Sequence, residues 1–86
     1  EELTESADTR LNPEQRAVQS EAREALQRIL DTMPDEYRSV FVLFEMEQLT
    51  TAEVAATLDL PEGTVSSRIF RARRFFERAV QRQSNR

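Results

Sequence analysis

Each of the three prolines in this 86-residue chain stands where one helix can end or another can begin. Pro13 follows Asn12, a favourable N-cap residue, and proline suits the first helical position because its missing N–H needs no partner there. Pro34 and Pro61 each follow an apolar pattern, and the residue before a proline disfavours helical backbone. The chain is therefore predicted to be a series of helices separated by short turns.

Apolar residues recur at helical spacing between these boundaries. A capping box of Asn12 with Gln15 opens the first helix. Its predicted apolar face is Ala22, Leu26, Ile29 and Met33. The second segment repeats the pattern after Pro34, with Tyr37, Val40, Phe41 and Phe44. The β-branched and aromatic residues 39–44 would also suit a strand, but no partner strand is indicated elsewhere, so a helix is preferred, followed by a polar connection from Glu45.

Residues 50–76 have the spacing of a helix-turn-helix. Thr50 and Glu53 form a second capping box, and Leu49 can pack on Val54 as a hydrophobic staple. After the turn, the last helix is expected to begin near Pro61 and to end at about Gln83.

The single glycine, Gly63, falls in the first turn of that last helix. A glycine lowers helix stability by about 1 kcal/mol relative to alanine. We therefore expect it to be there because it lets neighbouring backbone approach closely.

The predicted fold is all-α, with four helices and a C-terminal helix-turn-helix of the winged-helix-like DNA-binding class but without a wing. Residues 1–11 are polar, acidic and aperiodic, and are expected to be a flexible linker or tail. Residues 12–83 are expected to form the helical domain, with the helix-turn-helix at 50–76. Because the chain begins with glutamate, we expect it to be part of a longer protein.

The composition argues against several functions. The chain has no cysteine and no histidine, so disulfides, the usual zinc ligands and the usual general base are all missing. Its acids are scattered along helix-like stretches. We therefore expect no enzyme activity, no catalytic residues, no metal, no cofactor and no small-molecule substrate. No apolar run approaches the ~20 residues of a membrane span, so no membrane insertion and a cytoplasmic location are expected.

Charge is segregated along the chain. Residues 1–62 carry 15 acids and 5 arginines, a net charge of −10, whereas residues 63–86 carry 7 arginines and one acid, a net charge of +6, which sum to −4. All 12 basic residues are arginine, which binds phosphates and guanine edges bidentately. A GC-rich genome would also favour arginine codons, but it would not concentrate them in one segment. The segregation indicates an anionic partner.

The last helix separates its residues onto two faces. The predicted core face is Val65, Ile69, Ala72, Phe76, Ala79 and Val80. The opposite face is Ser67, Arg71, Arg74 and Arg78, flanked by Ser66 and Phe70, with Arg68, Arg73 and Phe75 on the borders. One alternative is an ordinary solvated face. Such faces usually mix charges of both signs, and Glu77 is the only acid after Gly63.

Residues 25–80 resemble region 4 of the sigma-70-family transcription initiation factors, of the extracytoplasmic-function (ECF, group 4) type. The first half of the resemblance is carried by "MP" and "YRSVFVL", and the second half by "TTAEVAATLDLPEGTVSSRIFRAR". The pattern P-x-G-T-V-x-S-R followed by R-A-R is more specific than a bare helix-turn-helix.

The resemblance implies a domain that reads the promoter −35 element with its last helix while attached to RNA polymerase through the β-subunit flap. It also implies regulation by an anti-sigma factor. Base contacts are then expected from Ser66, Ser67, Phe70 and Arg71. Phosphate contacts are expected from Thr50, Thr51, Arg68, Arg73, Arg74 and Arg78, the two threonines through the helix N-terminus that they open. Many relatives carry lysine or arginine where this chain has Ser66, which implies a different −35 preference.

Two other functions fit parts of the sequence. One is the helix-turn-helix output domain of a dimeric transcriptional regulator, because the T-V-x-S portion suits both classes. The other is a protein-binding helical module that uses Phe70 and Phe75. Footprinting separates the first from a sigma domain, and the salt dependence of DNA binding separates the second.

Overall fold

The computed structural model describes residues 11–85, and this part of the chain contains helices and no strand. The elements in order are α1 (Pro13–Thr32), α2 (Asp35–Phe41), the π-helical segment η3 (Val42–Met46), α3 (Thr51–Leu58) and α4 (Glu62–Ser84). The all-α prediction with four α-helices is confirmed. The predicted flexible tail at 1–11 lies almost wholly outside the described residues.

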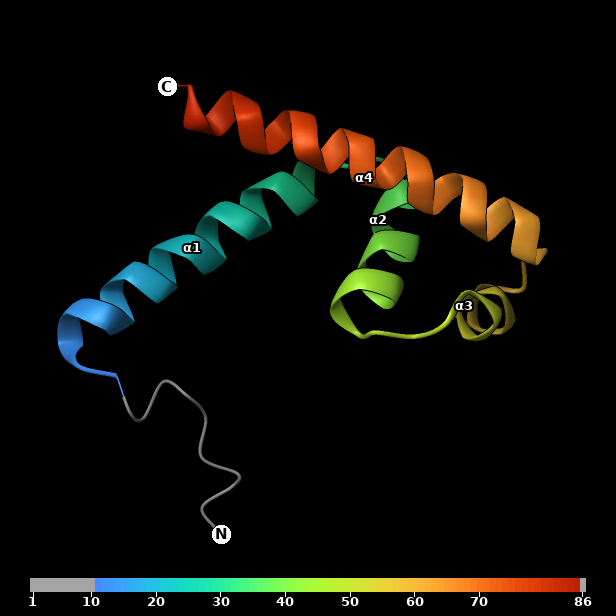
Figure 1. Cartoon of the computed structure of the whole chain (residues 1–86), viewed down its shortest axis with the longest axis horizontal. Coiled ribbons are helices and arrows are strands. Elements are labelled where there is room, and N and C mark those ends of the chain that lie inside the picture. The colour runs from blue at the N-terminus through green and yellow to red at the C-terminus, as the bar shows by residue number, and fades with distance from the viewer. Residues whose placement is uncertain (1–10, 86) are drawn as a thin grey trace, which may run out of the picture.

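The long helix α4 organises the domain (Figure 1). Helix α2 crosses it near the middle, and α3 packs beside its N-terminal part. Helix α1 contacts α4 only through its own C-terminal part, and its N-terminal half extends away from the other helices. Helices α1 and α4 therefore diverge like the arms of a V.

One core lies where α4 meets α2 and α3. Its buried members are Leu30, Met33, Val40, Phe41, Val54, Val65, Ile69 and Ala72. The rings of Phe41 and Phe76 stack at its edge, with 4.8 Å between their centroids. Burial of these side chains is the main force that holds the short helices in place, since helices of seven or eight residues are marginal alone.

The first two helices are joined by a side chain that was not predicted to matter. The Arg38 Nε atom donates to the carbonyl oxygen of Leu30 and its Nη2 atom to that of Met33, each at 2.8 Å. Both carbonyls lie at the C-terminal end of α1, where the regular helical hydrogen bonds run out, although the Leu30 oxygen also accepts from the Met33 N–H at 3.1 Å. Met33 is buried as expected, but it lies just past the end of α1 in extended backbone, and Ala22 is exposed.

The helix predicted after Pro34 is present, but its last part is a π-helix. The Glu47 N–H donates to the Val42 carbonyl oxygen at 2.9 Å, five residues back. Helical backbone therefore runs to Met46, and the polar connection expected from Glu45 is shorter than predicted. Gln48 then takes a left-handed conformation with φ of 62°.

The turn of the helix-turn-helix is closed by backbone geometry. Asp59 follows α3 in the left-handed conformation, with φ of 58°, and aspartate tolerates this better than most residues. The Leu60 N–H donates to the Ala55 carbonyl oxygen at 3.0 Å. Helix α4 begins at Glu62, within one residue of the predicted position.

Two expectations for α4 are wrong. Val80 was assigned to the core face but is 38% exposed, because it lines the open groove between α1 and α4. The reason given for Gly63 also fails, since a Cβ atom placed there would meet no atom within 4 Å. No neighbouring backbone approaches this glycine.

Gly63→Ala is therefore expected to stabilise the domain. The backbone of Gly63 is helical and not left-handed, so alanine fits without strain and reduces the freedom of the unfolded chain. We expect the free energy of unfolding to rise by about 0.5–1 kcal/mol. Urea unfolding followed by circular dichroism measures this, and a loss of stability would show that Gly63 has a neighbour in solution.

Candidate nucleic-acid interface

The exposed surface of α4 carries all four residues that were expected to contact bases. Ser66, Ser67, Phe70 and Arg71 are exposed, and Phe70 is 62% exposed, which is unusual for an aromatic ring. They lie in the first half of α4, which is the part that α3 supports. We call these four residues the reading crest.

Packing against α3 fixes the orientation of the reading crest. Val54 of α3 and Val65 of α4 are fully buried, and Ile69 follows one turn later. The Thr50 hydroxyl accepts from the Glu53 N–H at 3.1 Å, and the Glu53 carboxylate accepts from the Thr50 N–H at 2.8 Å, so the predicted capping box is present. A rigid two-helix unit therefore presents the crest.

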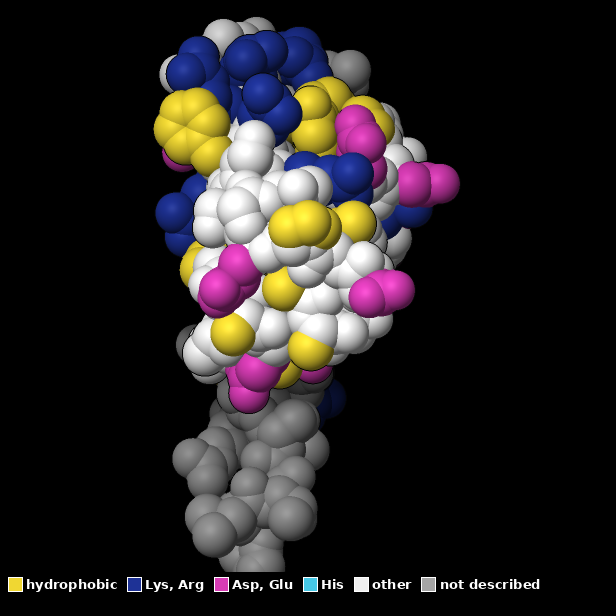
Figure 2. Space-filling view, turned by 90° about the vertical axis from the view of Figure 1, so that its right-hand side faces the viewer, with side chains coloured by type: hydrophobic (Ala, Val, Ile, Leu, Met, Phe, Trp, Pro, Cys, Tyr) yellow, Lys and Arg dark blue, Asp and Glu magenta, His cyan; other side chains and the backbone are white. Residues whose placement is uncertain are grey.

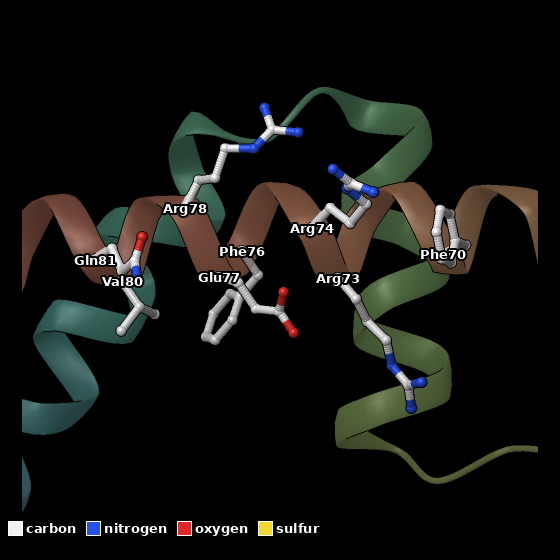
Figure 3. A pocket seen from close by; sticks show the side chains of 8 residues that line it. All are labelled: Phe70, Arg73, Arg74, Phe76, Glu77, Arg78, Val80 and Gln81. Atoms are coloured by element: carbon white, nitrogen blue, oxygen red, sulfur yellow. The ribbon is translucent and has the colours of Figure 1, made fainter.

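Four arginines stand along the exposed side of α4 without an acidic partner among the described residues: Arg71, Arg74, Arg78 and Arg82. The guanidinium of Arg74 lies over the ring of Phe70, 5.7 Å from its centroid. Figure 3 shows Arg74 and Arg78 leaving one side of α4 and Arg73 leaving another. The unpaired arginines thus form a positive ridge beside Phe70.

The flanking residues are placed differently. Arg73 Nε donates to the Glu45 carboxylate of η3, and its guanidinium lies 5.5 Å from the centroid of the Phe44 ring. Arg68 lies 3.9 Å from a carboxylate oxygen of Glu36. Both were predicted to contact phosphates, and both are paired within the domain.

The two threonines at the start of α3 are also engaged. The Thr50 hydroxyl is part of the capping box, and the Thr51 hydroxyl donates to the Glu62 carboxylate at 3.2 Å. Phe75 is half-buried against the core, as expected for a border residue. The residues beside the reading crest are thus bonded within the domain, whereas the arginines on the exposed side of α4 have no acidic partner among the described residues. The sequence did not indicate this difference.

Charge is sorted in space as well as along the chain. Figure 2 views the domain from the end where α3 and the start of α4 lie, and basic side chains gather at its top, where α4 runs. Acidic side chains lie mostly below and around them. On this face, the α4 side is therefore suited to a polyanion.

A second surface feature was missed by the sequence reasoning. An apolar groove lies between the diverging arms of α1 and α4, lined mainly by Ala22, Ala25, Leu26, Ile29, Phe76 and Val80. A further hollow on α1 includes Val18, which is 65% exposed. The signal was present, because the apolar face of α1 continues toward its N-terminus beyond the part that contacts α4.

The described part of the chain offers few other sites. Residues 11–85 contain no group of three or more acids that could hold a metal ion. None of the helices seen there is both long and apolar enough to cross a bilayer. The reading crest and the unpaired arginines beside it are therefore the main candidate binding surface of these residues.

Comparison with known proteins agrees with this geometry. Residues 23–76 match the family model described as "Sigma-70, region 4", a range that includes α2, η3, α3 and most of the crest helix. The chain is 40% identical over 70 residues to the protein named ECF RNA polymerase sigma-E factor of Escherichia coli K12 and of Salmonella typhimurium LT2. It is 33% identical over 70 residues to the RNA polymerase sigma-H factor of Pseudomonas aeruginosa.

These alignments cover 81% of this chain, but only 37% of the two sigma-E factors and 36% of the sigma-H factor. The chain thus spans little more than a third of the length of the curated relatives it matches. The family match includes the buried residues that join α3 to α4 and the whole reading crest. From the helix-turn-helix, its supporting core and this match, the chain belongs to the sigma-70 region 4 family.

Proposed function

We propose that this domain reads the −35 element of promoters as part of an RNA polymerase holoenzyme. The observation that carries the proposal is the reading crest, which stands exposed on the second helix of a helix-turn-helix beside arginines that have no acidic partner among the described residues. Recognition helices of this type place their N-terminal residues against base edges in the major groove. The function needs binding and no catalysis.

The chemistry of the crest suggests how bases are distinguished. Arg71 can donate two hydrogen bonds to the O6 and N7 atoms of a guanine, and the ring of Phe70 can contact a thymine methyl group. Ser66 and Ser67 are small enough to let the helix approach the base edges closely. Contacts from Arg74 and Arg78 to phosphates would set the register of the helix without carrying sequence information.

The length of α4 limits which residues share one groove. Its 23 residues extend over about 34 Å, whereas the major groove is about 12 Å wide. The crest and Arg74 fit within the groove and its edges. Arg78 lies a turn further along and is proposed to contact a phosphate at the groove margin.

The partners of the domain are part of the same proposal. We propose that RNA polymerase binds through its β-subunit flap, and the apolar groove between α1 and α4 offers a surface on which an apolar helix could be buried. An anti-sigma factor is proposed to regulate the protein by covering such surfaces. Since promoter DNA and polymerase are the partners, a cytoplasmic location follows from the proposal.

Footprinting tests the proposal directly. A sigma factor that carries this chain as its region 4 is assembled with core polymerase on a promoter and treated with hydroxyl radicals. We expect one protected segment around position −35, continuous with the polymerase footprint, that is lost without core polymerase. Two half-sites separated by about one helical turn would instead indicate a dimeric regulator.

A further inference from the structure

Three carboxylates of the domain lie against residues that were expected to contact DNA phosphates. Glu45 of η3 accepts from Arg73, and Glu62 at the start of α4 accepts from Thr51 at 3.2 Å. Glu36 of α2 lies 3.9 Å from Arg68. The Glu45 and Glu62 carboxylates thus accept hydrogen bonds that a phosphate oxygen could accept instead, whereas Glu36 lies close enough to Arg68 to offset its charge but not to form a hydrogen bond.

The arginines on the exposed side of α4 have no such acidic neighbour in the described part of the chain. Within residues 11–85, Arg71, Arg74 and Arg78 form no ion pair, although α4 is surrounded by a domain rich in acids. The difference has a geometric cause: Arg68 and Arg73 stand on the borders of α4, from which their side chains reach α2 and η3, whereas Arg74 and Arg78 leave α4 on a different side from Arg73 (Figure 3).

We infer that Glu36, Glu45 and Glu62 act as internal substitutes for phosphate, which weaken DNA binding by the free domain while leaving its base-reading residues exposed. This inference rests on the proposed function. Phosphate contacts supply most of the sequence-independent affinity, whereas base contacts supply discrimination. A domain whose border arginines are paired with its own acids, and whose reading crest is exposed, therefore binds DNA weakly on its own. It still distinguishes between base sequences.

Attachment to RNA polymerase would change the balance between these internal pairs and contacts with DNA. A domain delivered to the promoter by polymerase binds DNA at a high effective concentration, at which exchanging Glu45 for a phosphate on Arg73 becomes favourable. A free domain at low concentration keeps its internal pairs. Stray binding to non-promoter DNA is reduced without any change in the residues that read bases.

The test compares Glu45→Gln with Glu47→Gln. Both variants lose one negative charge, but Glu47 is exposed and has no ion pair among the described residues. Binding of the 86-residue chain to a fluorescent duplex of mixed sequence is measured by anisotropy at several salt concentrations. Any duplex serves, because phosphate contacts do not depend on sequence.

We expect Glu45→Gln to bind about two- to fivefold more tightly than Glu47→Gln, the range that corresponds to an exposed ion pair. Its plot of log affinity against log salt should be steeper by about 0.9, the value for one added phosphate contact. In an Arg73→Gln background the gain from Glu45→Gln should vanish, which a double-mutant cycle measures.

Equal binding and equal salt slopes for the two glutamate variants would overturn the inference, as would a gain that persists without Arg73. If binding of the unmodified chain is too weak to measure, the triple variant Glu36→Gln, Glu45→Gln, Glu62→Gln must bind measurably at about 50 mM salt, and absence of binding overturns the inference. Failure of the proposed function is seen separately, as promoter transcription that does not depend on Arg71.

Discussion

Arg71→Ala is expected to lower −35-dependent transcription about 5- to 150-fold, the effect of losing a bidentate base contact worth about 1–3 kcal/mol. The side chain is exposed and forms no ion pair among the described residues, so its removal should leave the fold intact. Alanine is also the best helix former. The loss should therefore appear in promoter recognition and not in protein stability or polymerase binding.

Arg82→Ala is the matched control for this prediction. Arg82 lies on the same helix, is exposed and carries the same charge, but it stands about 17 Å further along the helix axis. Both variants are assembled with core polymerase as region 4 of a sigma factor, and transcription is measured alongside the affinity for core enzyme. Equal losses for the two would mean that only general positive charge is needed, and no loss for Arg71→Ala would count against a reading role.

Phe41→Ala is expected to have the largest effect on stability, a loss of about 3–5 kcal/mol in the free energy of unfolding. Phe41 is buried in the core cluster and stacks on Phe76, so its truncation removes contacts between α2 and α4 and leaves a cavity. Domains of this size have a total stability of roughly 4–13 kcal/mol, so the variant should be partly unfolded at moderate temperature.

Phe70→Ala makes the same chemical change at an exposed position. With 62% of its surface exposed, Phe70 should contribute less than about 0.5 kcal/mol to folding. Urea unfolding of the two variants, followed by circular dichroism, tests the contrast. Similar losses in both would mean that Phe70 packs against the domain in solution and is not available to contact bases.

Much of the fold can be predicted because its helix ends are marked locally. Asn12 with Gln15 and Thr50 with Glu53 form capping boxes within four residues of sequence, and both are present in the structure. Helix α4 ends at Ser84, one residue past the predicted end. The exposure of the reading crest follows from helical periodicity and is confirmed, while its contacts with bases remain a prediction.

What could not be predicted depends on the arrangement of the helices. The ion pair of Arg73 with Glu45 joins residues 28 positions apart, and the exposure of Val80 depends on the open groove between α1 and α4. Periodicity places a residue on a face but does not say whether another helix covers that face. Gly63 shows the converse, since a local rule suggested a close neighbour that the fold does not provide.

The most direct test of the reading crest is selection from promoters with a randomised −35 region, transcribed by polymerase that carries this chain as region 4 of its sigma factor. The unmodified chain should select a defined −35 sequence, and Arg71→Ala and Phe70→Ala should each relax the preference at one or two adjacent positions while leaving the others unchanged. Selection of the same sequence by all three proteins, with equal strength at every position, would contradict the claim that this face of α4 reads promoter DNA.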